Sequence, residues 1–425
     1  MSKSMLLVGT RKGLFVLESG DRRDWSVRGP YCESWPIYHA VLDRDSGSIY
    51  AAAASEWLGS AIWRSPDLGE TWEHSSEGLG YPEEDGGLRL SKVSHVMPVD
   101  GRLLVGAEAA GLFESTDGGQ TFSLLTTFEG QEGREAWNDP AQQPPGHLGL
   151  SAIIPHPNEA DRFWVIVQGF SLFETNDGGQ TWEPRNKGLR RDWPADYEEI
   201  GFCVHKVAPA SDFERMYQQN HVGMHRSDDA GKTWTEITEG LPTEFGFAAA
   251  THPHDRDTFF VIPLDPGHGR TMPDGHAAVW RTRDAGSSWQ RLAQGLPSEN
   301  AYVGVLRDGM AIDGQDEPGL YFGTSTGQLF ASTDEGESWS QIGGLFPGIT
   351  SVTVAAAVGR TWSAAAITPQ ASPQRTIIAV FASAANAFTW ARASGGVATP
   401  SDSNSSGVPT SIVLPPWVAT RPLPR

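Results

Sequence analysis

The chain has 425 residues and a formal net charge of −20, and it contains 48 Gly, 29 Pro and 16 Trp residues but only two cysteines. The acidic charge repels phosphate backbones and anionic lipid, so we expect neither nucleic acid nor a membrane as a partner. Because no Cys-x-x-Cys pair is present, a disulfide framework and a thiolate zinc site are excluded as organising features of the fold.

The N-terminal region reads as a strand rather than as a targeting signal. Its apolar stretch near Met5 is too short for a signal peptide, which favours a cytoplasmic location. Arg11 and Lys12 follow in a turn, and a second alternating segment comes after them. The repeat described next predicts a propeller built from sheets of four strands, called blades. In such a blade this pair corresponds to the second and third strands, so the innermost strand of this blade must come from elsewhere in the chain.

An eight-residue repeat with the pattern Ser/Thr-x-Asp-x-Gly-x-Thr/Ser-Trp/Phe recurs along the chain. Its aspartates are Asp67, Asp117, Asp177, Asp229, Asp284 and Asp334, and a decayed copy contains Asp21. The copies lie about 50 residues apart, which is the length of one four-stranded propeller blade. Asp and Ser/Thr side chains accept the N–H groups of a turn, so we expect a structural role for these aspartates. The spacing predicts an all-β, seven-bladed β-propeller over residues 1–357.

The innermost strands of four consecutive blades are expected to begin near His39, His95, Ser151 and His205, which are 56, 56 and 54 residues apart. Equal spacing predicts that these positions share one register at the mouth of the channel. Three interpretations of the histidines are open. Each imidazole bonds a neighbouring carbonyl, or the histidines act as acid–base catalysts near neutral pH. In the third, His39, His95 and His205 hold a divalent metal ion; no other cofactor is expected.

The hairpins between the second and third strands rim the same face. We predict that the catalytic residues come from His39, His95, His205, His221, Glu56 and Glu108. We predict that the substrate-binding residues come from Arg11, Lys12, Asn220, Arg270, Tyr302 and Arg307. Arg307 is expected on an innermost strand, where a charge needs a partner or a ligand. Cys203 lies two residues before His205, so a Cys–His nucleophile and an inert buried thiol both remain open.

The C-terminal part of the chain differs from the repeats. Residues 349–356 alternate like a strand, and we predict that they close the ring beside the N-terminal strand. Residues 358–425 contain five Arg and a single acidic residue, Asp402, and they are rich in Ala, Ser and Pro. We interpret them as a mostly disordered tail, with a docking segment or a weak membrane contact as the alternatives.

The eight-residue motif is identified as the Asp-box, or bacterial neuraminidase repeat, and the chain resembles bacterial sialidase-like BNR-repeat proteins. The resemblance is carried by residues 38–43, 203–206, 217–221, 301–307 and 321–330. It implies a propeller with ligands at the top of the channel. True sialidases also carry a Phe-Arg-Ile-Pro segment, which is absent here, so genuine sialidase activity is not expected. Sortilin-like receptors and xyloglucan hydrolases share the repeat, so the fold leaves the function open.

Two classes of function fit these observations. The first is an enzyme that acts on a small polar or glycan-like substrate at the top face, a hydrolase or lyase using the channel-mouth histidines. The second is a non-catalytic platform for binding or assembly, for which Trp57 in an enlarged hairpin is a point in favour. The polar mouth favours the enzyme, and a protein partner is compatible with either class.

Overall fold

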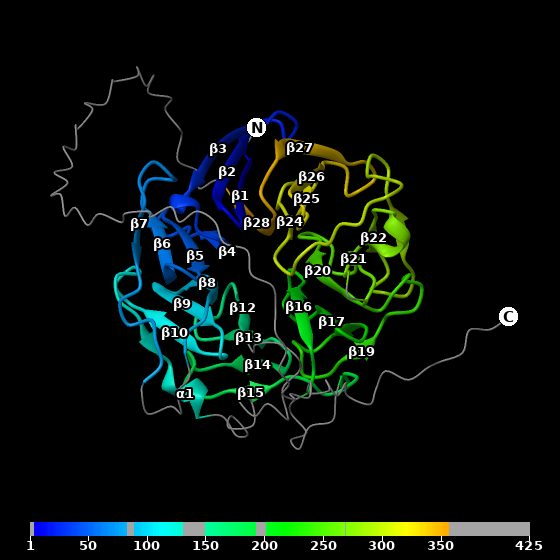
Figure 1. Cartoon of the computed structure of the whole chain (residues 1–425). Helices are drawn as coiled ribbons and strands as arrows, with labels where there is room; N and C mark the ends of the chain where they lie inside the picture. Colours follow the sequence, from blue (N-terminus) through cyan, green and yellow to red (C-terminus); the bar gives the residue numbers. More distant parts are fainter. Residues whose placement is uncertain (1–3, 83–88, 131–148, 193–200, 268, 357–425) are drawn as a thin grey trace, which may run out of the picture. The chain divides into compact units, whose positions relative to one another are not determined.

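The computed structural model describes residues 4–82, 89–130, 149–192, 201–267 and 269–356. Their strands form seven antiparallel sheets of four strands each, arranged as a ring (Figure 1). The predicted all-β, seven-bladed propeller is therefore confirmed. Helical structure in these ranges is limited to three short segments, α1 (Thr126–Glu129), η1 (Cys32–Ser34) and η3 (Pro273–Gly275). Within these ranges, no helix has the length and hydrophobicity needed to cross a bilayer. The predicted tail, residues 358–425, lies outside the described residues.

Each blade runs from an innermost strand at the channel to an outer strand at the circumference. The innermost strands are β4 (Ile37–Leu42), β8 (Val93–Val99), β12 (Leu150–Pro155), β16 (Val204–Pro209), β20 (Gly246–Thr251), β24 (Met310–Ile312) and β28 (Ile349–Ala356). The second strands are β1 (Ser4–Thr10), β5 (Ile49–Ser55), β9 (Arg102–Ala107), β13 (Phe163–Val167), β17 (Met216–Asn220), β21 (Phe259–Pro263) and β25 (Leu320–Gly323).

The third and fourth strands complete each blade. The third strands are β2 (Gly13–Ser19), β6 (Gly59–Ser65), β10 (Leu112–Ser115), β14 (Ser171–Thr175), β18 (Met224–Ser227), β22 (Val279–Thr282) and β26 (Gln328–Ser332). The outer strands are β3 (Ser26–Tyr31), β7 (Glu73–Ser75), β11 (Ser123–Leu124), β15 (Glu183–Pro184), β19 (Thr235–Glu236), β23 (Gln290–Leu292) and β27 (Ser340–Leu345).

The ring is closed by a strand from the far end of the propeller. Strand β28 pairs antiparallel with β1, from Ser4 opposite Ala356 to Thr10 opposite Ile349. In Figure 1 this strand lies beside the blue N-terminal strands, and together they form one blade. The predicted closing strand at residues 349–356 is thus confirmed. Closure gives β1 a partner on both sides and so removes an exposed sheet edge.

The repeated motif forms the turn between the third and fourth strands, on the side away from the rim hairpins. In one copy, the Ser115 hydroxyl donates to the Asp117 carboxylate at 2.8 Å, and the backbone N–H groups of Gln120 and Thr121 donate to the same carboxylate. The Thr121 hydroxyl also donates to this carboxylate, at 2.6 Å. This bond lowers the pKa of Asp117 most, and the other hydrogen bonds lower it further. The carboxylate is therefore occupied by its own turn, in agreement with the predicted structural role.

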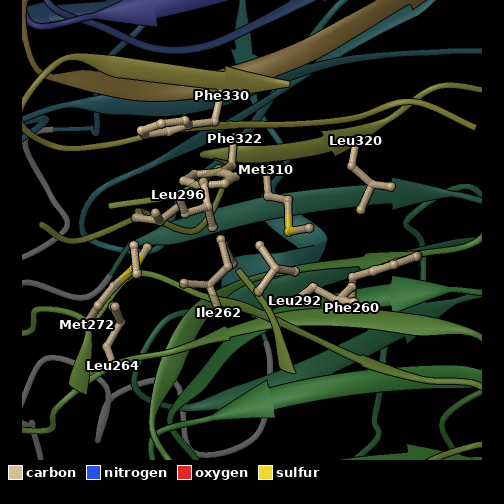
Figure 2. Packing of buried hydrophobic residues seen from close by; sticks show 14 of the residues in the cluster. Phe260, Ile262, Leu264, Met272, Leu292, Leu296, Met310, Leu320, Phe322 and Phe330 are labelled. Carbon is tan, nitrogen blue, oxygen red and sulfur yellow. The ribbon is translucent and has the colours of Figure 1, made fainter. Parts of the chain in front are cut away.

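The aromatic residue that ends each motif connects neighbouring blades. The indole N–H of Trp234 donates to the carbonyl of Arg185 in the preceding blade at 2.9 Å, and Trp289 donates in the same way to Ile237. Apolar residues fill the remaining space between blades. Figure 2 shows such a cluster between the blades of β20–β23 and β24–β27, where Phe260 and Ile262 pack in one buried cluster with Phe322. Both faces of the second strands are buried in this way, as in β13, whereas outer strands such as β7 and β19 are largely exposed.

Candidate functional site

A cavity of about 650 Å³ lies at the predicted mouth of the channel. Its wall includes the starts of four innermost strands, β4, β8, β12 and β28, and the turns that rim the same face. The polar and aromatic residues that line it are Arg11, Tyr38, Ser55, Glu56, Trp57, Lys92, Ser94, Ser151, Gln168, Arg307, Asp308 and Thr350. Both acidic and basic side chains thus face one cavity, which is large enough for several sugar rings or a comparable polar ligand.

A β-bulge occurs at the start of four consecutive innermost strands, and the bulged residues of the first three line this cavity. The bulged residues are Tyr38, Ser94, Ser151 and His205, and the residues that follow them are His39, His95, Ala152 and Lys206. The predicted common register of His39, His95, Ser151 and His205 is therefore wrong for Ser151 and His205, which are the bulged residues of their strands. The residue equivalent to His39 and His95 in the next strand is Ala152, one residue further along than equal spacing predicts. His205 therefore corresponds to Tyr38 rather than to His39.

Four buried or partly buried side chains form a polar cluster along the channel. The imidazoles of His39 and His95 stack with their ring centroids 3.7 Å apart, and His39 Nδ1 hydrogen-bonds the carbonyl of Val96 at 3.0 Å. His95 Nδ1 lies 3.8 Å from Asp308 Oδ2, and the Lys206 ammonium donates to Asp308 Oδ1 at 2.6 Å. We call His39, His95, Lys206 and Asp308 the channel cluster.

The channel cluster holds a charged carboxylate next to neutral imidazole. Burial alone would raise the pKa of Asp308, but the Lys206 ammonium and the His95 ring hold it well below its usual range. Burial and the neighbouring His95 hold the pKa of His39 well below 6.5. At neutral pH, Asp308 is therefore ionised and His39 is neutral.

A second cluster lies at the start of β16. Cys203 Sγ and His205 Nε2 are 3.3 Å apart, and His205 Nδ1 hydrogen-bonds the carbonyl of Gly246 at 2.6 Å. Burial raises the pKa of the Cys203 thiol to about 12, so it is protonated at neutral pH. Ligand atoms of Cys203, His205 and His221 all lie within 4.8 Å of one another.

The predicted metal set of His39, His95 and His205 is not assembled. Among the described residues, the group formed by Cys203, His205 and His221 is the only set of three or more potential metal-ligating side chains within reach of one ion. The reason is the shifted register, which puts His205 beside Cys203 and leaves His39 and His95 stacked on each other.

The two predicted rim carboxylates have different surroundings. Glu56 is exposed in the β5–β6 turn, and its carboxylate makes no hydrogen bond or ion pair within the described part of the chain. Glu108 is paired with the Lys92 ammonium and accepts the Ser91 hydroxyl. Burial raises the pKa of Tyr38, and the negative charge of Glu108 raises it further, so this phenol stays protonated.

The predicted substrate-binding residues divide into two groups. Arg11 and Arg307 line the cavity, although Arg307 precedes β24 rather than lying on it. The other four are placed elsewhere: Lys12 and Tyr302 are exposed outside the cavity wall, Asn220 is buried and bonded to Gln218, and Arg270 lies over Phe245 and Phe247. The predicted contact of Asn220 with substrate is thus not seen, because this side chain is enclosed by its own blade.

Sequence reasoning missed four residues of the site, namely Tyr38, Lys92, Lys206 and Asp308. Tyr38 and Lys206 are next to residues that were selected, so a search for bulged strand starts would have included them. Asp308 follows Arg307 directly, but its partner Lys206 is 102 residues away, and no local signal connects the two.

Comparisons with known proteins place the chain among propellers. No protein-family model matches it. A xyloglucanase of Hypocrea jecorina (strain QM6a) is 26% identical over 328 residues, 73% of this chain and 33% of that protein. A xyloglucanase of Paenibacillus sp is 26% identical over 298 residues, 66% of this chain and 23% of that protein. The chain thus spans a third or less of these curated relatives.

A solved structure agrees with the observed fold. A putative 6-phosphogluconolactonase from Bacteroides fragilis NCTC 9343 superposes with a TM-score of 0.53 at 10% sequence identity, covering 83% of this chain and 98% of that one. At such low identity the likeness concerns the fold alone. The resemblance to sialidase-like proteins that the repeat suggested stays a prediction. Together, these comparisons and the observed sheets assign the chain to the seven-bladed propellers and relate its sequence to proteins named xyloglucanase.

Proposed function

We propose that the protein is a hydrolase that cleaves a glycan in the cavity at the mouth of the channel. The observation that carries this proposal is that two carboxylates in different environments line one cavity. Asp308 is held ionised by Lys206, whereas Glu56 is exposed and unpaired within the described residues. The similarity to two proteins named xyloglucanase supports a glycan as the substrate class.

The two carboxylates fit the two tasks of glycoside hydrolysis. The reaction needs one acid that protonates the leaving oxygen and one carboxylate that activates water or stabilises positive charge on the sugar. Asp308 suits the second task because its charge is maintained by the Lys206 ammonium at 2.6 Å. Glu56 is assigned the first task because it lines the same cavity and its carboxyl group is not held in an ion pair within the described residues.

The other groups in the cavity would bind and orient the sugar. The Trp57 side chain is 92% exposed in the β5–β6 turn, and an exposed indole offers a flat apolar surface to the face of a pyranose ring. Arg11, Lys92 and the protonated phenol of Tyr38 supply hydrogen-bond donors for hydroxyl groups. His95 lies between the stacked His39 and the Asp308 carboxylate, and we assign it the role of orienting Asp308.

The test measures release of reducing sugar ends from xyloglucan and from other soluble glycans. Wild-type protein should release them, and Glu56→Gln should lower the rate by about 100-fold or more, as expected for loss of a general acid. The exposed Glu299 does not line the cavity, and Glu299→Gln is the matched control that should keep the wild-type rate. Equal rates in the two variants would contradict the assigned acid.

Asp308→Asn is the complementary variant. It should also lower the rate by at least about 100-fold. Because Asp308 is ion-paired with Lys206, the melting temperature of this variant must be measured alongside its rate. If Asp308→Asn does not fold, the Glu56→Gln rate alone tests the proposed hydrolysis. A folded Asp308→Asn protein with the wild-type rate would exclude this carboxylate from the reaction.

A non-catalytic binding platform is the second candidate, and one observation favours it. Trp57 and its neighbour Leu58 are both exposed at the rim, with Leu58 at 60%. A platform predicts that the wild-type protein binds the glycan without releasing reducing ends and that Trp57→Ala abolishes the binding. Assistance by a metal and the cytoplasmic location both stay predictions.

A further inference from the structure

We propose that Cys203, His205 and His221 form a binding site for a zinc ion, with the fourth position open. This proposal does not depend on the proposed glycan hydrolysis, because neither Glu56 nor Asp308 belongs to the group. The three ligand atoms lie within 4.8 Å of one another, and they combine one sulfur with two imidazole nitrogens. Zinc takes such mixed sulfur and nitrogen ligands in tetrahedral geometry, and three protein ligands leave one position free.

The geometry of the Cys203–His205 pair fits a shared zinc ion. With Zn–S and Zn–N bonds of ordinary length, sulfur and nitrogen at two corners of a tetrahedron are about 3.6 Å apart. Cys203 Sγ and His205 Nε2 are separated by 3.3 Å. The pair can therefore accept the ion after a small widening of this contact.

The tautomer of His205 also fits. Its Nδ1 is 2.6 Å from the carbonyl oxygen of Gly246 in the next blade, so Nδ1 carries the proton and donates it. That leaves the lone pair of Nε2 directed toward Cys203 and available for a metal. A backbone carbonyl that accepts the second N–H of the imidazole is the usual support of a metal-binding histidine.

The third ligand is brought to the pair by the rim turn of the same blade. The backbone N–H of His221 donates to the carbonyl of Cys203 at 3.0 Å, which ties the turn after β17 to the start of β16. The rings of His205 and His221 are 5.7 Å apart, and Phe245 packs against both. His221 is only partly buried, so the ion can reach the site from the surface turn.

Charged side chains of both signs border the site. Arg270 lies over the ring of Phe245 and Arg307 over that of Phe247, and both rings pack against His205. Asp192 accepts the backbone N–H of Cys203 at 2.6 Å through Oδ2, and its buried Oδ1 has no hydrogen-bond partner within the described residues. The site is therefore not purely cationic, and the open position beside the arginines suits water or an anion.

The test uses the full-length protein, stripped with a chelator and then titrated with Zn²⁺ and with Co²⁺. We expect one ion per chain by elemental analysis after dialysis, and with Co²⁺ the charge-transfer absorption of a cobalt–thiolate bond. Cys203→Ser should lose this absorption, and His221→Ala should weaken Zn²⁺ binding by at least about 10-fold. Cys32→Ser is the matched control, because Cys32 is the other buried thiol and lies outside the group.

Two results would overturn the proposal. One is a folded wild-type protein that binds no Zn²⁺ beyond the level of Cys203→Ser. The other is a Co²⁺–thiolate band that survives in Cys203→Ser, which would place the ion elsewhere. If Cys203→Ser fails to fold, the wild-type Co²⁺ spectrum and the partly buried His221→Ala decide: absence of the band, or unchanged Zn²⁺ affinity in His221→Ala, contradicts the site.

Discussion

The imidazoles of His39 and His95 stack across the boundary between two blades, with ring centroids 3.7 Å apart and an interplanar angle of 26°. They occupy the same position after the bulge in neighbouring innermost strands, so the repeat itself brings them together. His39 also bonds the carbonyl of Val96 in the neighbouring blade. The pair therefore connects two blades, and His95 Nδ1 lies 3.8 Å from Asp308 Oδ2.

His39→Ala should destabilise the fold. The substitution leaves the carbonyl of Val96 without its side-chain donor in a buried place, which costs about 1–3 kcal/mol. The free energy of unfolding from urea titration measures this loss. His276→Ala, at an exposed histidine, is the control and should change little. Equal unfolding free energies for both variants would show that the Val96 bond contributes nothing.

Lys206→Met should be more damaging than the combination of Lys206→Met with Asp308→Asn. Removing the ammonium alone leaves a partly buried carboxylate without its cation, which costs about 3 kcal/mol or more. Neutralising the carboxylate as well should restore part of this stability. A double-mutant cycle of unfolding free energies measures the coupling, and additive losses would contradict the ion pair as a coupled unit.

The fold could be predicted because its signals are local and repeated. Each copy of the motif forms its own turn with bonds such as those to Asp117, so its position marks the end of a third strand wherever it occurs. The closing strand could be found because the first blade lacked an innermost strand and residues 349–356 alternate suitably.

The site could be predicted only in part. The location of the cavity followed from the fold, and Arg11, Glu56 and Arg307 line it as expected. The alignment of His205 failed because the blade that begins with β8 is one residue longer than the blade before it. Equal spacing from His39 and His95 therefore leads to the bulged residues Ser151 and His205 instead of the residues that follow the bulge. The pairing of Lys206 with Asp308 needs the closed ring, which no local pattern encodes.

His225 should make the fold less stable in mild acid. It is fully buried in β18, and burial lowers its pKa from 6.5 to about 4. The unfolded chain therefore binds a proton at this residue below about pH 6.5 while the folded chain does not, so stability falls as the pH decreases. By about pH 4 the loss from this residue approaches 3 kcal/mol.

The measurement is a comparison with His225→Leu. Unfolding free energies of both proteins are determined between pH 7 and pH 4, because other groups titrate in the same range and cancel in the difference. The variant should lose less stability on acidification than the wild type. Parallel curves would mean that His225 does not titrate differently in the folded and unfolded states.

Gly327→Ala should weaken the rim turn between β25 and β26. The residue has a φ of +98°, and an added Cβ would lie 1.9 Å from the carbonyl oxygen of Phe346. A left-handed conformation costs a residue with a side chain about 1–2 kcal/mol, and the clash adds to this. The melting temperature should therefore drop in this variant, whereas Gly314→Ala, which meets no atom within 4 Å, should leave it nearly unchanged.

Two truncations separate the closing strand from the tail. A chain that ends after residue 358 keeps β28. The removed residues are rich in Ala, Ser and Pro, so we expect a melting transition close to that of the full chain. A chain that ends at Gly348 loses β28 and leaves all seven residues of β1 without their inner partner. The exposed edge should lower the melting temperature strongly and promote association between copies. Calorimetry and light scattering measure both effects. If the two truncated proteins melt alike, β28 does not hold the ring closed, and if the longer one fails to fold, the tail is an integral part of the structure.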